Sequence, residues 1–280
     1  MDAVILLNKP AGMTSFDAVR RCRMTLHEKK AGHTGTLDPQ ASGLMIVLLG
    51  RYTKLLPYCT ADRKTYHAEF RTGIRTDTED IWGNVIEEKE TSFHSDEELE
   101  NACAKMRGQI MQVPPMYSAL KVNGRKLYQY ARKGIEVERQ PRPVTVHSLT
   151  VRRTGEDTYE MDACVSAGTY IRTLIADYCA SLEEIGTMTS LIRSGIGSLK
   201  LEDACNLDDL NENSGIDPLL AVSDVYEITE AGEHADDIMH GRSFALKDAG
   251  TYIMFVQNGS ILAAYEKRQD GLYHCARGLY

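Results

Sequence analysis

The chain has 280 residues, of which 42% are hydrophobic and 26% charged, and its formal net charge is −8 at pH 7. This composition indicates a globular protein that can bury a sizeable core, enough for one large domain and a small one. No apolar stretch approaches the ~20 residues that cross a bilayer, and the N-terminus lacks the basic start and cleavage site of a signal peptide. We therefore expect a cytoplasmic protein with no membrane partner.

The cysteines exclude two further classes of protein. There are seven, they are scattered along the chain, and none forms a Cys-x-x-Cys pair. We interpret them as reduced thiols, neither a zinc cluster nor a disulfide framework.

The N-terminal part predicts short strands around a helix. Val4 to Leu7 is an apolar strand, and Thr14 and Ser15 can cap a helix that runs to about Leu26. The continuous apolar run from Leu44 to Leu49 predicts a buried strand.

Between the two apolar segments lies a glycine-punctuated loop, GHTGTLDP at residues 32–39. Its glycines allow a tight fold and the close approach of a planar substrate to the main chain. Two interpretations of Asp38 follow. It is a reactive carboxylate, or it is the N-cap of an ordinary helix that has Pro39 at its first position.

The middle of the chain continues the mixed pattern. Apolar and polar residues alternate from Lys64 to Arg71, as in a strand, so Tyr66 is predicted to face inward. Glu97 to Gly108 is predicted to be a helix, Gly155 to Val165 a strand, and Tyr170 to Leu182 a helix.

Charge is segregated along the chain. Residues 105–153 hold eleven Lys or Arg against two Glu, whereas residues 201–240 hold twelve acidic residues and no Lys or Arg. Because the Debye length is ~8 Å at physiological salt, a basic face attracts phosphates while a distant acidic region is screened. Tyr117, Tyr128 and Tyr130 lie among the cations and suit unpaired RNA bases. We favour a nucleic-acid partner over a solvated surface stripe.

The end of the chain predicts a small β-rich module. An acidic stretch from Leu201 to about Ser223 marks the joint. Beyond it, Asn-Gly and Asp-Gly pairs typical of hairpins separate three short strands, at Thr251 to Phe255, Ile261 to Tyr265 and Gly271 to His274. The chain has no 20–50-residue repeat and is not doubly wound, so the predicted class is α+β.

Five segments together resemble the TruB-type pseudouridine synthases, the enzymes that make pseudouridine 55 in the T-loop of tRNA. In chain order they are NKPAGMTSFDAV (8–19), AGHTGTLDPQASGLMIVLLG (31–50), KTYHAEFRTGIRTDTEDIWG (64–83), PPMYSALKVNGRKLYQYARKG (114–134) and SAGTYIRTL (166–174). Residues 241–267 are similar to the short bacterial C-terminal module, which resembles a PUA domain. The resemblance implies a catalytic domain built on a largely antiparallel mixed sheet with flanking helices.

The resemblance also implies the chemistry. Uridine becomes pseudouridine when its C1′–N1 bond is replaced by a C1′–C5 bond, without redox change or net hydrolysis, so no cofactor and no metal are expected. By resemblance Asp38 is the nucleophile, Arg172 pairs with it, and Tyr66 stacks on the target base and takes a proton from the sugar. A neighbouring guanidinium lowers the pKa of a carboxyl by ~1–3 units. Which uridine atom Asp38 attacks is left open.

Further residues are assigned to the substrate by resemblance. His33 fills the space vacated by the extruded uridine, whose extrusion costs a few kcal/mol. The other members of this group are Tyr170, Leu191, Asp80 and Lys9. The chain departs from the family at Ile192, where an Arg commonly follows the Leu.

The basic residues Lys121, Arg125, Lys126 and Arg132 lie in a segment that resembles a loop closing over RNA, where they contact phosphates. The implied organisation is a catalytic domain at residues 1–222, with its RNA-binding loop at about 105–153, and a PUA-like RNA-binding module at 223–280. The expected partner is the T-stem-loop of tRNA, with no guide RNA, and the protein is expected to be a monomer.

Two other classes of function stay open. A non-catalytic tRNA-binding protein or RNA-folding chaperone uses the same basic loop and flipping histidine, but has no need of Asp38 and Arg172 together. A hydrolase acting on a glycosidic bond needs a second carboxylate as acid or base, and the motifs do not supply one.

Overall fold

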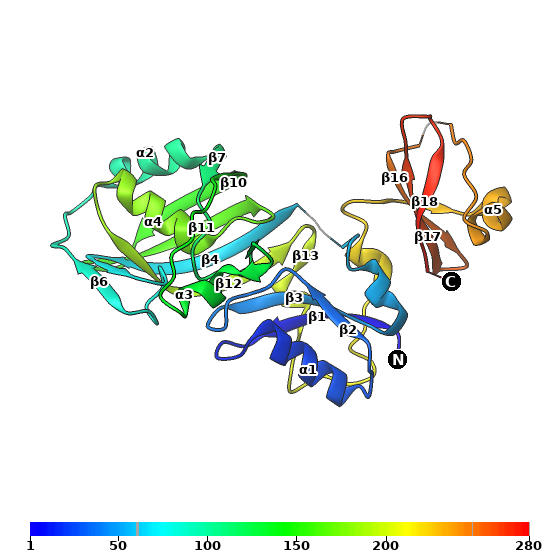
Figure 1. The fold of residues 1–280 in the computed structure, drawn as a ribbon, viewed down its shortest axis with the longest axis horizontal. Helices are drawn as coiled ribbons and strands as arrows, with labels where there is room; N and C mark the ends of the chain where they lie inside the picture. The colour runs from blue at the N-terminus through cyan, green and yellow to red at the C-terminus, as the bar shows by residue number, and fades with distance from the viewer. Residues whose placement is uncertain (60–61, 248, 280) are drawn as a thin grey trace. The chain divides into compact units, whose positions relative to one another are not determined.

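The structure is a computed structural model that describes residues 1–59, 62–247 and 249–279 (Figure 1). The chain divides into two compact units: residues 1–61 with 196–280 form unit 1, and residues 62–195 form unit 2. In the described ranges, no helix combines the length and apolar character needed to cross a membrane.

The N-terminal part of unit 1 contains three paired strands and one helix. Strand β1 (Ala3–Lys9) pairs antiparallel with β3 (Ser42–Leu49), whose other edge carries β2 (Ala31–Thr34). The helix α1 (Ser15–Thr25) begins at a capping box, in which Thr14 and Asp17 bond each other's backbone N–H groups. These elements confirm the predicted strands and helix.

The C-terminal part of unit 1 starts with short elements: β13 (Leu199–Lys200), η2 (Leu201–Asp203), β14 (Cys205–Asn206, parallel to β1) and η3 (Pro218–Ala221). A four-stranded sheet follows, in the order β15 (Glu227–Glu230), β16 (Tyr252–Gln257), β17 (Ser260–Lys267) and β18 (Tyr273–Gly278). The last three are the predicted strands, and Asn258 and Gly259 turn β16 into β17 with φ of +51° and +74°. The parallel strand β15 was not predicted. The remaining elements are η1 (Gly50–Leu55), η4 (Gly232–His234) and α5 (Ala235–Met239).

Both ends of the chain contribute to one core of unit 1. The buried side chains include Val4, Leu6, Ile46 and Leu48 from the N-terminal strands, and Val222, Met254, Ala264 and Leu279 from the C-terminal part. Contiguous apolar burial of this kind is the main stabilising term of a folded unit.

Unit 2 is built on five strands that pair in the order β12-β4-β11-β10-β7. The strands are β4 (Arg63–Thr72), β7 (Gly108–Gln112), β10 (Arg142–Arg153), β11 (Thr158–Ser166) and β12 (Gly186–Ile196). The pairs β4/β11, β11/β10 and β10/β7 are antiparallel. Smaller elements are the pairs β5 (Ile74–Thr76) with β6 (Val85–Glu88) and β8 (Lys121–Val122) with β9 (Arg125–Lys126), and the short helix α3 (Leu127–Ala131).

Helices α2 (Asp96–Met106) and α4 (Ile171–Ser181) pack together and cover one face of this sheet (Figure 1). Under them Phe70 of β4 stacks on Tyr159 of β11, with ring centroids 5.2 Å apart, and meets the edge of Tyr178 of α4 at 6.0 Å. Both helices were predicted, and the mixed, largely antiparallel sheet with flanking helices confirms the predicted α+β class. The strand predicted from Gly155 begins later, at Thr158.

The aromatic core of unit 2 gives a stability prediction. Phe70→Ala should lower the free energy of unfolding by ~3–5 kcal/mol, because the removed ring is 1% exposed and leaves a cavity. Phe16→Ala, at a side chain 70% exposed, is the matched control and should stay within ~0.5 kcal/mol of wild type. Urea unfolding measures both, and equal losses in the two variants would contradict the burial described here.

Candidate active site

The loop that carries Asp38 joins β2 to β3 in unit 1. The backbone carbonyl of Asp38 accepts a hydrogen bond from the N–H of Ala41 at 3.1 Å, so Asp38 opens a tight turn, and β3 begins directly afterwards at Ser42. The interpretation of Asp38 as a helix N-cap is therefore wrong. Strand β3 is buried between β1 and β2, and its pairing with both overrides the local preference of Asp-Pro for a helix start.

Three residues of the N-terminal motif hold this loop in place. The buried Lys9 ammonium donates to the carbonyls of Pro10, Met13 and Pro39, at 2.8, 2.7 and 3.2 Å. The N–H of Gly12 also donates to the Pro39 carbonyl, at 2.9 Å. A lysine is almost never fully buried unless its charge is compensated, so these contacts give Lys9 an organising role in the loop.

Ser15 makes the third attachment, from the first residue of α1. Its hydroxyl accepts from the N–H of Leu37 at 2.9 Å and donates to the carbonyl of the same residue at 3.1 Å. Both side chains are buried. The residue before Asp38 is thus fixed to the start of a helix. His33 lies on β2 with its backbone opposite Val47 of β3, on the strand that leads into the same loop.

In unit 2, Arg172 lies in the first turn of α4 and is 3% exposed. Its guanidinium donates to the backbone carbonyl of Thr78 at 2.7 Å and to that of Tyr117 at 2.8 Å. Asp80 stands beside it, with 3.9 Å between Arg172 Nε and Asp80 Oδ2. The structure therefore brings two of the predicted site residues, Arg172 and Asp80, together.

The loop around Asp80 is ordered by its own hydrogen bonds. The Asp80 carboxylate accepts from Thr78 Oγ1 at 2.8 Å and from the N–H of Trp82 at 3.2 Å. The N–H of Ile81 donates to the Met188 carbonyl on β12 at 2.9 Å. An acidic run of this kind is often only solvated, but here it forms a fixed loop against the sheet.

Tyr170 is the residue immediately before α4, and its backbone is held by Gln112 at the end of β7. The amide side chain of Gln112 accepts from the N–H of Tyr170 at 2.8 Å and donates to its carbonyl at 3.1 Å. Gln112 is 2% exposed. This bidentate contact fixes the start of α4, where no side-chain cap is present among the described residues.

Tyr66 and Leu191 lie on neighbouring strands, β4 and β12, and both are buried. Tyr66 thus faces inward, as predicted from the alternation. Side chains two residues apart on a strand share a face, so Lys64 lies on the Tyr66 face and Arg193, 1% exposed, on the Leu191 face. Burial and the charge of Arg193 lower the pKa of Lys64. Ile192 points to the opposite face of β12, so the departure from the family pattern falls away from Leu191.

The four predicted phosphate-binding residues lie on a hairpin and the helix after it. Lys121 and Arg125 are exposed on β8 and β9, and Lys126 and Arg132 flank α3. Buried Leu127 anchors the hairpin, which turns at Asn123 and Gly124 with φ of +51° and +79°. The ends of the predicted 105–153 loop lie in α2, β7 and β10, so the connection between β7 and β10 is residues 113–141, which include β8, β9 and α3.

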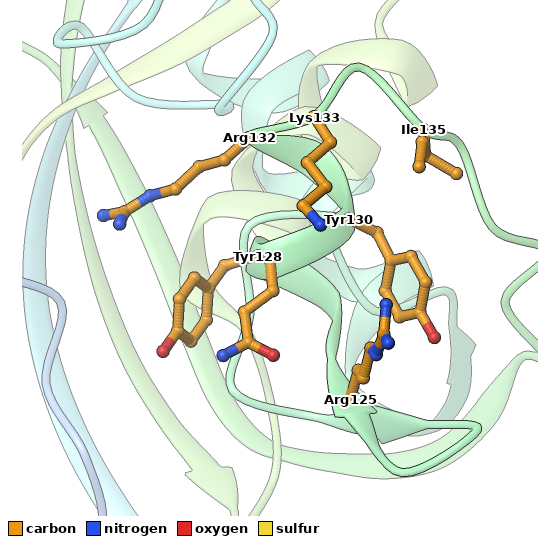
Figure 2. Close-up of a pocket in the computed structure, with 7 residues that line it drawn as sticks. Arg125, Tyr128, Tyr130, Arg132, Lys133 and Ile135 are labelled. Atoms are coloured by element: carbon orange, nitrogen blue, oxygen red, sulfur yellow. The ribbon is translucent and has the colours of Figure 1, made fainter.

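A pocket opens on this segment (Figure 2). Its lining includes Arg125, Tyr128, Tyr130, Arg132 and Lys133. The Tyr128 ring carries two cations, with Lys126 Nζ 5.7 Å and Arg132 Cζ 5.4 Å from its centroid. A ring flanked by positive charge is suited to stacking on a nucleic-acid base.

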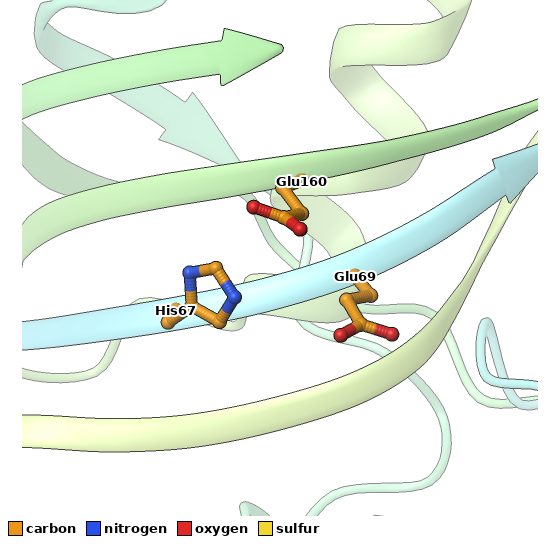
Figure 3. Close-up of side chains that lie close together, drawn as sticks. All are labelled: His67, Glu69 and Glu160. Atoms are coloured by element: carbon orange, nitrogen blue, oxygen red, sulfur yellow. The ribbon is translucent and has the colours of Figure 1, made fainter. Parts of the chain in front are cut away.

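A separate cluster could hold a metal ion on the exposed face of the sheet. Ligand atoms of His67, Glu69 and Glu160 lie within 4.8 Å of one another (Figure 3). His67 Nδ1 is bonded to Asp162 at 2.8 Å, and Arg152 contacts Glu160. These contacts also form a cross-strand ion-pair network, so the facing carboxylates have partners on the sheet without a metal ion.

The sequence interpretation missed several residues of the site. Gln112, Ser15 as a loop partner, Lys64 and Arg193 were not singled out. The period-2 pattern contained a signal for Lys64, which lies two positions from Tyr66 on a predicted strand, but none for Arg193, because β12 was not predicted. Gln112 bonds a residue 58 positions away, which no local pattern indicates.

Comparison with known proteins identifies the class of protein. Residues 23–171 match the sequence model of the TruB family pseudouridylate synthases (N-terminal domain), so the chain belongs to this family. It is 37% identical to the tRNA pseudouridine synthase B of Streptococcus sanguinis strain SK36, over 96% of this chain and 97% of the relative. The tRNA pseudouridine synthase B of Clostridium perfringens strain 13 is 45% identical, over 76% of this chain and 72% of the relative. A chain in the solved Cbf5-Nop10-Gar1 complex has the same fold, with a TM-score of 0.70 at 22% identity, covering 94% of this chain and 78% of that one.

The anchoring of the Asp38 loop gives the second prediction. Ser15→Ala removes both hydrogen bonds to Leu37 and leaves two buried backbone groups unsatisfied, so the free energy of unfolding should fall by ~1–3 kcal/mol. Ser15→Thr keeps the hydroxyl and is the control. Urea unfolding measures both variants. A loss of stability as large in the Thr variant as in the Ala variant would show that packing, and not the hydroxyl, holds the loop.

Proposed function

We propose that this protein isomerises uridine 55 in the T-loop of tRNA to pseudouridine, acting in the cytoplasm without a guide RNA or a protein partner. Membership of the TruB family and the relatives named tRNA pseudouridine synthase B support a pseudouridine synthase acting on tRNA. The observation that carries the proposal is the Asp38 loop, because Lys9, Gly12 and Ser15 fix the backbone around one carboxylate. Such fixation is what a nucleophile needs.

The reaction moves the C1′ bond of uridine from N1 to C5. The proton on C5 is lost and N1 gains one, so no water, oxidant or reductant is consumed. In the proposed mechanism Asp38 supplies the carboxylate that attacks the uridine, and the covalent intermediate holds the substrate while the uracil turns. Arg172 and Asp80 provide a fixed pair of charges for the reaction, and their mutual contact reduces their reorganisation.

Tyr66 and Leu191 are proposed to form the apolar wall on which the target base stacks. Both are buried on adjacent strands, and a flipped base needs an aromatic or apolar surface to replace its lost stacking. Tyr170 is proposed as a further pocket residue, since Gln112 fixes its backbone. His33 is proposed to occupy the gap left in the RNA.

The basic segment is proposed to hold the RNA backbone. Lys121, Arg125, Lys126 and Arg132 are the phosphate contacts, and Tyr128 between two cations is suited to an unpaired base. The net charge of −8 does not oppose this, because attraction to phosphates depends on the local charge. Residues 1–222 are proposed as the catalytic domain and residues 223–280 as an RNA-binding module.

Substitution of Asp38 tests the chemistry. Asp38→Asn and Asp38→Ala should abolish turnover, because neither side chain can form the covalent intermediate, while affinity for tRNA stays within about threefold of wild type. Tritium release from tRNA carrying 5-tritiated uridine measures turnover, and filter binding measures affinity. Release by Asp38→Ala at the wild-type rate would rule out this mechanism. Binding without release by the wild-type protein would favour the non-catalytic tRNA-binding protein.

Charge removal tests the basic segment. Lys121→Gln with Arg125→Gln should weaken tRNA binding without changing which uridine is modified. The slope of log affinity against log salt should become shallower by roughly one for each phosphate that the variant no longer neutralises. Arg75→Gln, at an exposed cation of β5 in the same unit, is the matched control. Wild-type binding that does not change between low and physiological salt would contradict the assignment.

A further inference from the structure

The backbone of Glu79 adopts an unusual conformation. Its φ is +64°, in the left-handed region that residues other than Gly, Asn and Asp seldom enter. Two backbone bonds fix it there, from the N–H of Glu79 to the Thr76 carbonyl at 3.3 Å and from the N–H of Met188 to the Glu79 carbonyl at 3.2 Å. Glycine takes this conformation without strain, so the presence of Glu indicates that its side chain has a use.

The side chain of Glu79 reaches α4. Thr173, the residue after Arg172, is 6% exposed and donates its hydroxyl hydrogen to Glu79 Oε2 at 2.7 Å. Arg172, the residue before Thr173, donates to the carbonyl of Thr78, the residue before Glu79. The two residues immediately before Asp80 are thus bonded to two consecutive residues of α4.

The charged groups that act on Glu79 lie on α4, in its own loop and in the segment before β10. Arg172 and Asp177 lie on α4, Asp80 is its neighbour in the loop, and Arg139 comes from the segment before β10. Burial raises the pKa of Glu79, although Thr173 and the two arginines oppose the rise. Asp177 keeps part of its surface in solvent, and desolvation together with the charge of Glu79 raises its pKa to about 6. Acid therefore reduces the attraction between Glu79 and Arg172 by protonating Glu79.

We propose that Glu79 is a positioning residue for the isomerisation, which through Thr173 holds the loop of Asp80 against Arg172 at the start of α4. The inference rests on the proposed function and deepens it, because Glu79 acts through Asp80 and Arg172 rather than on the uridine. Its carboxylate links the two segments that carry this charge pair.

Four variants separate a positioning role from a merely structural one. Glu79→Gly relieves the backbone strain, so its thermal midpoint should equal or exceed that of wild type, while kcat for tritium release falls about tenfold and KM changes less than about twofold. Thr173→Val should lower kcat similarly. The double variant Glu79→Gly with Thr173→Val should lose no more kcat than either single variant, because both substitutions remove the same hydrogen bond. Thr173→Ser should restore kcat.

The pH profile adds a readout that stability does not give. Glu79→Gln keeps an oxygen that accepts from Thr173 but cannot ionise, so it should retain at least about half of the wild-type kcat at pH 7.5 and show a flatter fall of kcat toward acid pH. Glu90→Gly, at an exposed residue of the same segment, is the matched control and should keep the wild-type kcat and profile. Wild-type kcat and pH profile in Glu79→Gly would overturn the proposal.

Amide hydrogen exchange, measured without RNA, distinguishes failure of the coupling between loop and helix from failure of the proposed function. Thr173→Val should accelerate exchange at Ile81, whose N–H is bonded to Met188 on β12. Unchanged exchange there would overturn the coupling of loop and helix. Accelerated exchange in a protein whose wild-type form releases no tritium from any tRNA would support the coupling and overturn the proposed function instead.

Discussion

The structure of unit 2 around Asp80 and Tyr117 depends on one constraint, which is the burial of the Arg172 guanidinium. A guanidinium stays protonated in proteins, so at 3% exposure it requires polar partners to replace its hydration. The carbonyls of Thr78 and Tyr117, with the carboxylate of Asp80, supply them. Two irregular segments that are distant in sequence are thereby fixed against one helix. Removing this charge would leave both segments with unsatisfied carbonyls, whatever else the arginine does.

Unit 1 uses the same physical device. The buried ammonium of Lys9 donates to one carbonyl of the Asp38 loop and to two of the segment between β1 and α1. Arg172 likewise donates to one carbonyl of the Asp80 loop and to that of Tyr117. Each cation lies beside a loop that carries an aspartate. Backbone carbonyls cannot be removed by mutation, so the geometry of each loop depends mainly on the cation, and on a serine or threonine at the start of the neighbouring helix.

Local patterns predicted the parts of this structure whose determinants are local. Helix α1 followed from its capping residues, the inward orientation of Tyr66 from alternation, and the turn at Asn258 from its glycine neighbour. Strand β12 escaped prediction because its buried face includes Thr187 and Arg193, which break the apolar alternation. The helix expected at Pro39 does not form because β3 pairs with strands on both sides. Thr173 and Glu79 are 94 residues apart, so only the fold could reveal their bond.

The shared core of unit 1 has a consequence for the order of events during synthesis. Val4 and Ile46 belong to one buried cluster with Met254 and Leu279, so β1 and β3 lack a complete hydrophobic surface until the four-stranded sheet has been synthesised. Unit 2 is encoded between them, is continuous in sequence and can fold first. The strands that flank the Asp38 loop would then be completed last. A nascent chain would already present the hairpin of β8 and β9 while the Asp38 loop still lacked the core that supports its flanking strands.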